Sequence, residues 1–276
     1  MPKVVALAAL TLVALGAALH PRTPSVTAGT LPVWFVNANI AVAGDGTAWD
    51  KALKSLTTAL GKPGDKEIWV AGGTYVPPVS FKPSIDKRTA TFTVGPGDRV
   101  FGGFTGAETS LEQRDPAAHE TILSGNIQNP GSGIDNAYTV VTLPATADAT
   151  AILDGFTVTT GFEDRDGQAA GGIESQGGSP VLANLVVRDN FGQKGAGLYS
   201  AGGGPSISQS RFVNNIDEFS RQDMSGLASG GGSLAVADTT FLDTRTGDLG
   251  GYLVKLFGGS ASIARSTFEA SSGVGV

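Results

Sequence analysis

The sequence contains no cysteine and only two histidines, His20 and His119. Without cysteine the chain can form neither disulfide bonds nor the acylated anchor of a lipoprotein, so its stability has to come from packing. His20 lies in or next to a leader segment, which leaves His119 alone as an expected surface turn residue. A serine triad or a histidine-rich zinc site is therefore not expected.

Charged residues are also scarce, at 16% of the chain, whereas hydrophobic residues make up 41%. That apolar content is enough to build a core, so disorder is not expected. Residues 1–28 contain Lys3 and Arg22 and no acidic residue, so the remainder has 17 basic and 25 acidic residues and a net charge of −8. Nucleic acid is a poor partner for such a chain, because phosphate binding needs clustered basic side chains.

The longest apolar run, from Val4 to Leu19, is shorter than the about 20 residues that span a bilayer. Lys3 precedes this run, and possible cleavage points with small residues lie near its end at Ala17-Ala18 and after it at Ala28. Residues 1–28 therefore read as a signal peptide, which predicts a secreted or cell-surface protein with no membrane span after cleavage. A single membrane anchor is the alternative.

Glycine is abundant, with 40 residues and no period of three, which indicates many tight turns between short strands. One helix is expected, because Trp49, Leu53, Leu56 and Leu60 recur at helical spacing before a stop at residues 61–64. We expect residues 29–65 to form an N-terminal strand and a capping helix that closes the open end of the fold.

The second half of the chain repeats, with three apolar positions in each repeat. The first position holds Ile173, Leu198, Leu227 and Val254; the second holds Leu182, Ile207, Val236 and Ile263; the third holds Val187, Phe212, Phe241 and Phe268. The intervals of nine and five residues between them are constant. The remaining interval, counted from Val158 of the preceding coil onward, is 15, 11, 15 and 13. Constant strands with one variable loop are typical of a solenoid, and the coils are 25 to 29 residues long.

A column between the second and third positions has to form a corner of each coil. It holds Gly155, Asn184, Gln209, Asp238 and Arg265. Glycine, asparagine and aspartate tolerate the left-handed backbone that a corner needs, whereas glutamine and arginine suit it less well. The third position predicts an internal ladder of Phe212, Phe241 and Phe268, with coils about 4.8 Å apart. Residues 66–150 fit the same solenoid less regularly.

The first coils also carry a family resemblance. The segments are 65–75 (DKEIWVAGGTY), 101–111 (FGGFTGAETSL), Arg114-Asp115 and 121–125 (TILSG). Over residues 33–160 the chain resembles the pectin-lyase-like right-handed parallel β-helix proteins of bacterial cell surfaces. The resemblance implies an all-β, single-stranded right-handed parallel β-helix over residues 66–276. Members of this group generally have no assigned chemistry, so it says little about function.

The repeats are also similar to those of chlamydial polymorphic outer-membrane proteins. Gly171-Gly172-Ile173 approximates one motif of that family, and Phe212-Val213-Asn214-Asn215 matches the other, Phe-x-x-Asn. The coils that begin at Phe241 and Phe268 lack the asparagine, and the membrane barrel of that family is missing from this sequence.

Two sets of residues are candidates for chemistry. Pectate lyases of this fold use a Ca²⁺ cluster beside a basic arginine, and the nearest counterpart is Glu163-Asp164-Arg165-Asp166, which offers oxygen ligands. Asp189 and Asp243 occupy equivalent positions two coils apart, roughly 9–10 Å, near the separation of an inverting carboxylate pair. The alternatives are a solvated acidic loop and two exposed strand ends. The motifs of lyases and polygalacturonases are absent.

The variable corner predicts a binding surface, because loops 161–170, 190–196, 215–226 and 244–251 have to lie side by side on a rigid scaffold. Candidate binding residues are Phe162, Glu163, Asp164, Asp166, Phe191, Asp217, Glu218, Arg221 and Asp223. We expect a non-catalytic scaffold for adhesion or for binding an extracellular polysaccharide or cell-surface glycan, with no cofactor unless it is Ca²⁺. The alternative is a polysaccharide lyase or glycoside hydrolase with a divergent active site.

The last coil ends in residues 271–276 without a covering helix. An open β-edge pairs readily with another chain. We therefore expect either further coils in the intact gene or end-to-end self-association.

Overall fold

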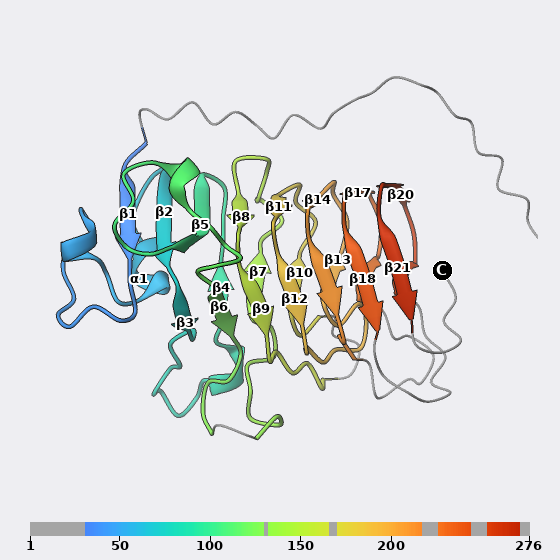
Figure 1. The fold of residues 1–276 in the computed structure, drawn as a ribbon. Coiled ribbons are helices and arrows are strands. Elements are labelled where there is room, and N and C mark those ends of the chain that lie inside the picture. Colours follow the sequence, from blue (N-terminus) through green and yellow to red (C-terminus); the bar gives the residue numbers. More distant parts are fainter. Residues whose placement is uncertain (1–30, 130–131, 166–169, 217–225, 244–252, 271–276) are drawn as a thin grey trace, which may run out of the picture. The chain divides into compact units, whose positions relative to one another are not determined.

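The computed structural model describes residues 31–129, 132–165, 170–216, 226–243 and 253–270, and these form three parallel sheets (Figure 1). The chain passes through the first, second and third sheet in turn, once in each coil. The predicted parallel β-helix is thereby confirmed. The predicted signal peptide lies outside the described residues, among which no helix is long and apolar enough to cross a membrane.

The strands are short, as the glycine content predicts. The first sheet contains β1 (Val33–Val36), β2 (Lys66–Ala71), β5 (Asp98–Phe104), β8 (Ile152–Asp154), β11 (Val181–Ala183), β14 (Ser206–Ser208), β17 (Ser233–Ala237) and β20 (Ser260–Ala264). The second contains β3 (Gly73–Tyr75), β6 (Thr121–Ser124), β9 (Thr157–Thr159), β12 (Val186–Arg188), β15 (Arg211–Val213), β18 (Thr240–Asp243) and β21 (Thr267–Ala270). The third contains β4 (Phe92–Thr93), β7 (Val141–Leu143), β10 (Ile173–Ser175), β13 (Leu198–Ser200), β16 (Leu227–Ser229) and β19 (Val254–Leu256).

The register of the coils is the one that the repeat predicts. Ile173 pairs with Leu198, Leu182 with Ile207 and Val187 with Phe212, and the later members of each column continue these pairings. The phenylalanine ladder is present: ring centroids are 5.0 Å apart for Phe212 and Phe241, and 5.1 Å for Phe241 and Phe268. Phe212 and Phe241 are buried and Phe268 is half-buried.

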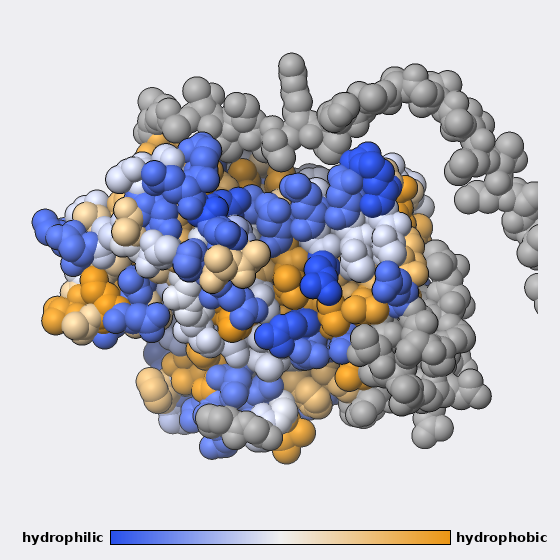
Figure 2. Space-filling view, viewed as in Figure 1, coloured by the Kyte–Doolittle hydropathy of each residue, from blue (hydrophilic) through white to orange (hydrophobic). Residues whose placement is uncertain are grey.

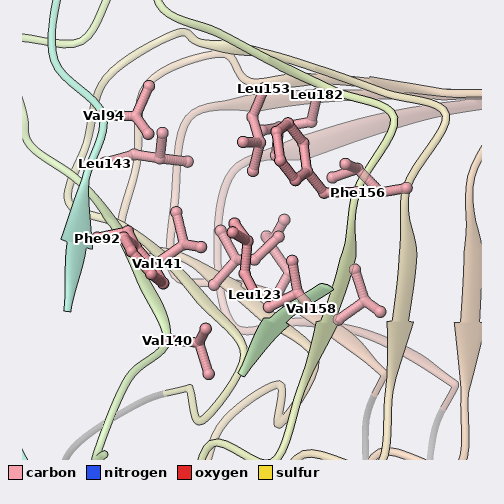
Figure 3. Close-up of a cluster of buried hydrophobic side chains, with 14 of the residues drawn as sticks. Phe92, Val94, Leu123, Val140, Val141, Leu143, Leu153, Phe156, Val158 and Leu182 are labelled. Carbon is pink, nitrogen blue, oxygen red and sulfur yellow. The ribbon is translucent and has the colours of Figure 1, made fainter. Parts of the chain in front are cut away.

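The interior is filled by aliphatic and aromatic side chains from all three sheets. Figure 3 shows Leu153 and Leu182 of the first sheet, Leu123 and Val158 of the second, and Phe92 and Val141 of the third pointing toward one another. All six are buried. Removal of this apolar surface from water is the main term that favours folding of a chain without disulfides.

The predicted corner adopts left-handed backbone throughout. Gly155 has a φ of 84°, and Asn184, Gln209, Asp238 and Arg265 have φ between 49° and 51°. Glutamine and arginine therefore occupy the corner, although left-handed backbone is sterically unfavourable for them. The guanidinium of Arg265 bonds the carboxylate of Asp238 one coil earlier, with both N···O distances 2.6 Å. A second left-handed corner, which the sequence reading missed, follows the second sheet at Thr160, Asp189 and Asn214.

The prediction of one continuous helix before the first coil is wrong, because the helix is shorter and interrupted. The segment forms the 3-10 turn η1 (Trp49–Lys51) and the short helix α1 (Leu56–Leu60), separated by Ala52 with a ψ of 151°. The helix breaks because the backbone of Leu53 pairs with β1: its N–H donates to Phe35 O and its carbonyl accepts from Asn37 N, both at 2.8 Å. Leu56 and Ala59 are still buried, and α1 packs against β1, β2 and β4.

Candidate functional site

The variable corner between the second and third sheets carries the candidate site. Phe162 pairs with Phe191 and Phe191 with Ile216, so the first three predicted loops begin side by side. Earlier coils add two long loops at the same corner, residues 76–91 between β3 and β4 and residues 125–140 between β6 and β7. These loops lie along the lower side of the described solenoid in Figure 1. The sequence reading did not assign them to the site.

Tyr138 is the centre of a side-chain cluster at this corner. Its ring lies between two guanidinium groups, with Arg88 Cζ 4.0 Å and Arg165 Cζ 3.9 Å from the ring centroid. Its hydroxyl donates to Asp86 Oδ2 at 2.8 Å. Guanidinium groups bind ring faces because the π system is negative there. Tyr138 thus joins the loops at 76–91, 125–140 and 160–165.

Arg88 connects the same three loops through hydrogen bonds. Its Nε donates to Asn136 O at 2.8 Å, its second terminal nitrogen donates to Phe162 O at 2.6 Å, and its first terminal nitrogen lies 3.0 Å from Asp164 Oδ1. A planar guanidinium supports such a fork of bonds, which lysine cannot reproduce.

Two groups of this cluster have shifted pKa values. The hydrogen bond from the backbone N–H of Arg88, helped by the one from Tyr138, lowers the pKa of Asp86. Burial, together with the hydrogen bond to Asp86, raises the pKa of Tyr138. At neutral pH, Asp86 is therefore a carboxylate and Tyr138 a neutral phenol that donates its proton to it.

Two of the three predicted calcium ligands are bound by arginines. Glu163 is 1% exposed and accepts two hydrogen bonds from the Arg165 guanidinium, at 2.9 and 2.6 Å. Asp164 forms the ion pair with Arg88. Asp166 lies outside the described residues, among which no group of three histidine, cysteine, aspartate or glutamate side chains could hold a metal. The calcium site at this loop stays a prediction.

The two aromatic residues among the candidate binding residues, Phe162 and Phe191, contact each other. The rings of Phe162 and Phe191 stack with centroids 4.4 Å apart, and Phe191 is only 7% exposed. Phe191 is therefore a buried residue of the corner, where adjacent coils bring the two rings into register, and its part in binding stays a prediction. Phe162 is half-buried.

The remaining candidates are the charged residues of the third loop and the two aspartates of the possible carboxylate pair. Asp217, Glu218, Arg221 and Asp223 lie outside the described residues. Asp189 sits at a left-handed corner and accepts from Arg188 at 2.9 Å. The side chain of Asp243 is not among those described, so the proposed carboxylate pair stays untested.

Exposed apolar side chains gather in the two loops that the sequence reading left out. Phe81 is 88% exposed, Ile134 72%, and Val76 and Ile85 slightly more than 40%. Figure 2 shows apolar side chains among charged ones at the lower end of this face. A Cβ added at Gly133 would lie 3.9 Å from the Phe162 ring, so the tip that holds Ile134 borders the cluster. The signal available in the sequence was the length of the gaps after Tyr75 and Ser124.

In the segment that carries the family resemblance, polar side chains form hydrogen bonds and an ion pair within the fold. Glu108 accepts hydrogen bonds from the backbone N–H groups of Thr105, Gly106 and Ala107, at 2.6 to 3.0 Å. Arg114 pairs with Asp154 at 2.8 Å. These polar groups order the loop between β5 and β6, which covers Phe104 and Trp69 on the outer face of the first sheet. His119 is half-buried in the same loop.

Comparisons with known proteins support the fold. No family model matches this sequence, and no curated protein matches it. Among solved structures, a pectate lyase, Pel9A, is similar with a TM-score of 0.51 and 14% identity, over 86% of this chain and 63% of that one. The chain thus spans less than two thirds of that lyase. At this identity the likeness shows a shared parallel β-helix fold and nothing about activity.

Proposed function

We propose that this chain is a secreted or cell-surface β-helix protein that binds a polysaccharide at the corner between its second and third sheets, without cleaving it. The observation that carries the proposal is the convergence there of exposed apolar side chains and arginines. Phe81 and Ile134 are exposed in two loops that the Tyr138 cluster connects to Arg165, whose side chain is 45% exposed.

The chemistry of this surface suits sugars. A pyranose ring presents apolar C–H groups that pack on an aromatic face, and hydroxyl or carboxylate oxygens that accept hydrogen bonds from guanidinium groups. The loops project from stacked coils, so several sugar units along a chain could be contacted at once. The apolar run from Val4 to Leu19, which follows Lys3, supports export.

The protonation of Arg165 favours binding of a polysaccharide over abstraction of a proton from it. The hydrogen bonds from its guanidinium to Glu163 raise the pKa of Arg165 above its ordinary value, although burial opposes this. A lyase base has to be able to accept a proton. An arginine that is held in its protonated form binds anions well and is a poor base.

The experiment is affinity electrophoresis of the full chain with polygalacturonate, alginate and a neutral glucan. Polygalacturonate is the first choice because the similar solved structure is a pectate lyase. We expect retention by at least one polymer, weakened about tenfold by Phe81→Ala, which corresponds to about 1.4 kcal/mol. Phe257→Ala is the matched control, because Phe257 is also exposed (47%) but follows β19, away from these loops.

The same samples test for catalysis. New ultraviolet absorbance from an unsaturated product, with or without Ca²⁺, would show a lyase and refute the non-catalytic part of the proposal. Absence of retention on all three polymers, or equal weakening by Phe81→Ala and Phe257→Ala, would refute the binding site.

A further inference from the structure

Three loops meet at the candidate site, and we call them loop A, loop B and loop C in chain order. They are residues 76–91, 125–140 and 160–165. Arg88, in loop A, is bonded to both of the others. Its backbone carbonyl accepts from Tyr138 N of loop B at 2.8 Å, and its guanidinium donates to Phe162 O of loop C at 2.6 Å. The Arg88 side chain is only 14% exposed, so water competes little for these bonds.

Arg114 makes contacts of the same kind elsewhere in the chain. Its side chain is also 14% exposed, pairs with the carboxylate of Asp154 at 2.8 Å, and donates to two backbone carbonyls, Gly102 O at 3.2 Å and Asp154 O at 3.3 Å. Its guanidinium lies 5.4 Å from the centroid of the Phe101 ring. Arg88 likewise bonds two backbone carbonyls and one aspartate and lies against an aromatic ring. The two arginines are thus matched in chemistry and burial.

The loops that the two arginines hold differ in their apolar contacts. The loop that Arg114 orders covers Trp69 and Phe104, so burial of apolar surface also holds it in place. Loops A and B instead expose Phe81 and Ile134, at 88% and 72%, and gain little from burial at these residues. Hydrogen bonds and ion pairs therefore contribute more to the order of loops A and B. A loop that is ordered in advance binds more tightly, because the cost of ordering does not fall on the binding step.

We infer that Arg88 is the positioning residue of the polysaccharide site, and that it fixes loop A against loops B and C before the polymer binds. This role rests on the proposed function, because it presupposes that these loops contact a polymer. Lysine in place of Arg88 keeps the charge near Asp164 but cannot donate in one plane to Asn136 O and Phe162 O as well. The core of the coils lies apart from these contacts, so Arg88→Lys should loosen the loops and leave the β-helix folded.

Amide hydrogen exchange of the full chain, without any polymer, measures how firmly the loops are joined. Two amides report on it, each with a bond of 2.8 Å between loops: Tyr138 N donates to Arg88 O, and Phe162 N donates to Ala137 O. We expect both amides to exchange at least about tenfold faster in Arg88→Lys, because hydrogen bonds to a charged group are lost and local opening becomes easier.

The matched control is Arg114→Lys. It should leave the exchange of the Tyr138 and Phe162 amides unchanged. It should instead accelerate exchange at Asp115 N, which donates to Gly103 O at 2.8 Å in the loop that Arg114 orders.

Affinity electrophoresis measures the consequence for binding, with whichever polymer the unaltered chain retains. Arg88→Lys should weaken retention about tenfold, as expected when bonds from a charged group no longer order the loops. Arg114→Lys should be retained as the unaltered chain is. Calorimetry should assign the loss in Arg88→Lys mainly to a less favourable entropy of binding, because the polymer then has to order the loops.

Unchanged exchange at Tyr138 and Phe162 in Arg88→Lys, or equal weakening of retention by Arg88→Lys and Arg114→Lys, would overturn the inference. Unfolding of the coils in Arg88→Lys, seen by circular dichroism, would also overturn it, because Arg88 would then hold the fold and not the loops. If no polymer retains the unaltered chain, the proposed function fails, and the exchange measurement still decides whether Arg88 fixes the loops.

Discussion

Tyr75 shows how a single polar group is accommodated inside the first coil. Its hydroxyl donates to Ala71 O at 2.9 Å and accepts from Ala38 N at 3.1 Å, and the residue is only 3% exposed. Burial raises the pKa of Tyr75 to about 12. The neutral phenol is therefore part of the folded structure, and its ionisation opposes folding.

The resulting pH dependence can be measured. The folded pKa of Tyr75 lies above its ordinary value of 10.0, so the stabilisation is complete below pH 10 and is lost as the pH rises toward 12. The full shift corresponds to at most about 3 kcal/mol. We expect the free energy of unfolding to fall more steeply over this pH range in the unaltered chain than in Tyr75→Phe. Parallel denaturation curves across the range would contradict this.

Asn190 and Asn215 are two polar residues of the interior that the sequence pattern did not predict. Both are buried, Asn190 Nδ2 donates to Asn215 Oδ1 at 3.0 Å, and Asn215 Nδ2 donates to Val187 O at 2.8 Å. The similarity of residues 212–215 to a Phe-x-x-Asn motif was the only signal. Such an amide ladder satisfies backbone groups where the coil turns after the second sheet.

At the scale of elements, successive coils place left-handed backbone at equivalent corner positions, although the residue type differs from coil to coil. The spacing predicted one left-handed column correctly, including Gln209 with a φ of 51°. The fixed interval of five residues leaves only two residues between the strands, and the second of them, such as Ser210, is buried. The second corner was missed because Thr160, Asp189 and Asn214 begin the loop of variable length, so no constant interval to the next strand marks their position. The helix before the first coil was overestimated because its apolar spacing could not reveal that Leu53 pairs with β1.

The steric cost of left-handed backbone at Gln209 leads to a prediction about the free energy of unfolding. Glycine adopts left-handed backbone without the steric cost that glutamine incurs, about 1–2 kcal/mol. Gln209→Gly should therefore raise the free energy of unfolding, by up to about 1 kcal/mol once the greater freedom of the unfolded chain is counted. Ser208→Gly, one residue earlier inside β14, should lower it by about 0.5–1 kcal/mol. Urea denaturation checks both changes, and a loss of stability in Gln209→Gly would contradict the argument.

At the scale of the whole molecule, the two ends of the described solenoid differ. Helix α1 lies over the first coil, whereas the inward column loses its cover at the last one: Val236 is 2% exposed and Ile263, its partner in β20, 39%. Leu256 and Phe257 are also exposed, at 44% and 47%. An apolar strand edge of this kind is a template for pairing with another strand.

We propose that this edge pairs with a second copy of the chain. Sedimentation of residues 31–276 should then show concentration-dependent association. Ile263→Lys should weaken it, because a charge on the edge opposes strand pairing. Ile134→Lys, at a more exposed isoleucine (72%) in the corner loops, is the control and should associate as the unaltered chain does. A monomer at all concentrations would refute the proposal.

The coil period, the inward columns, one corner and the position of the variable loops could be read from the sequence alone. They follow from local spacing, because every coil has to place apolar residues at the same three positions. The composition of the site could not be read in this way. Arg88 and Asp164 are 76 positions apart and Arg88 and Phe162 are 74 apart, and only the stacking of coils brings them within hydrogen-bonding distance.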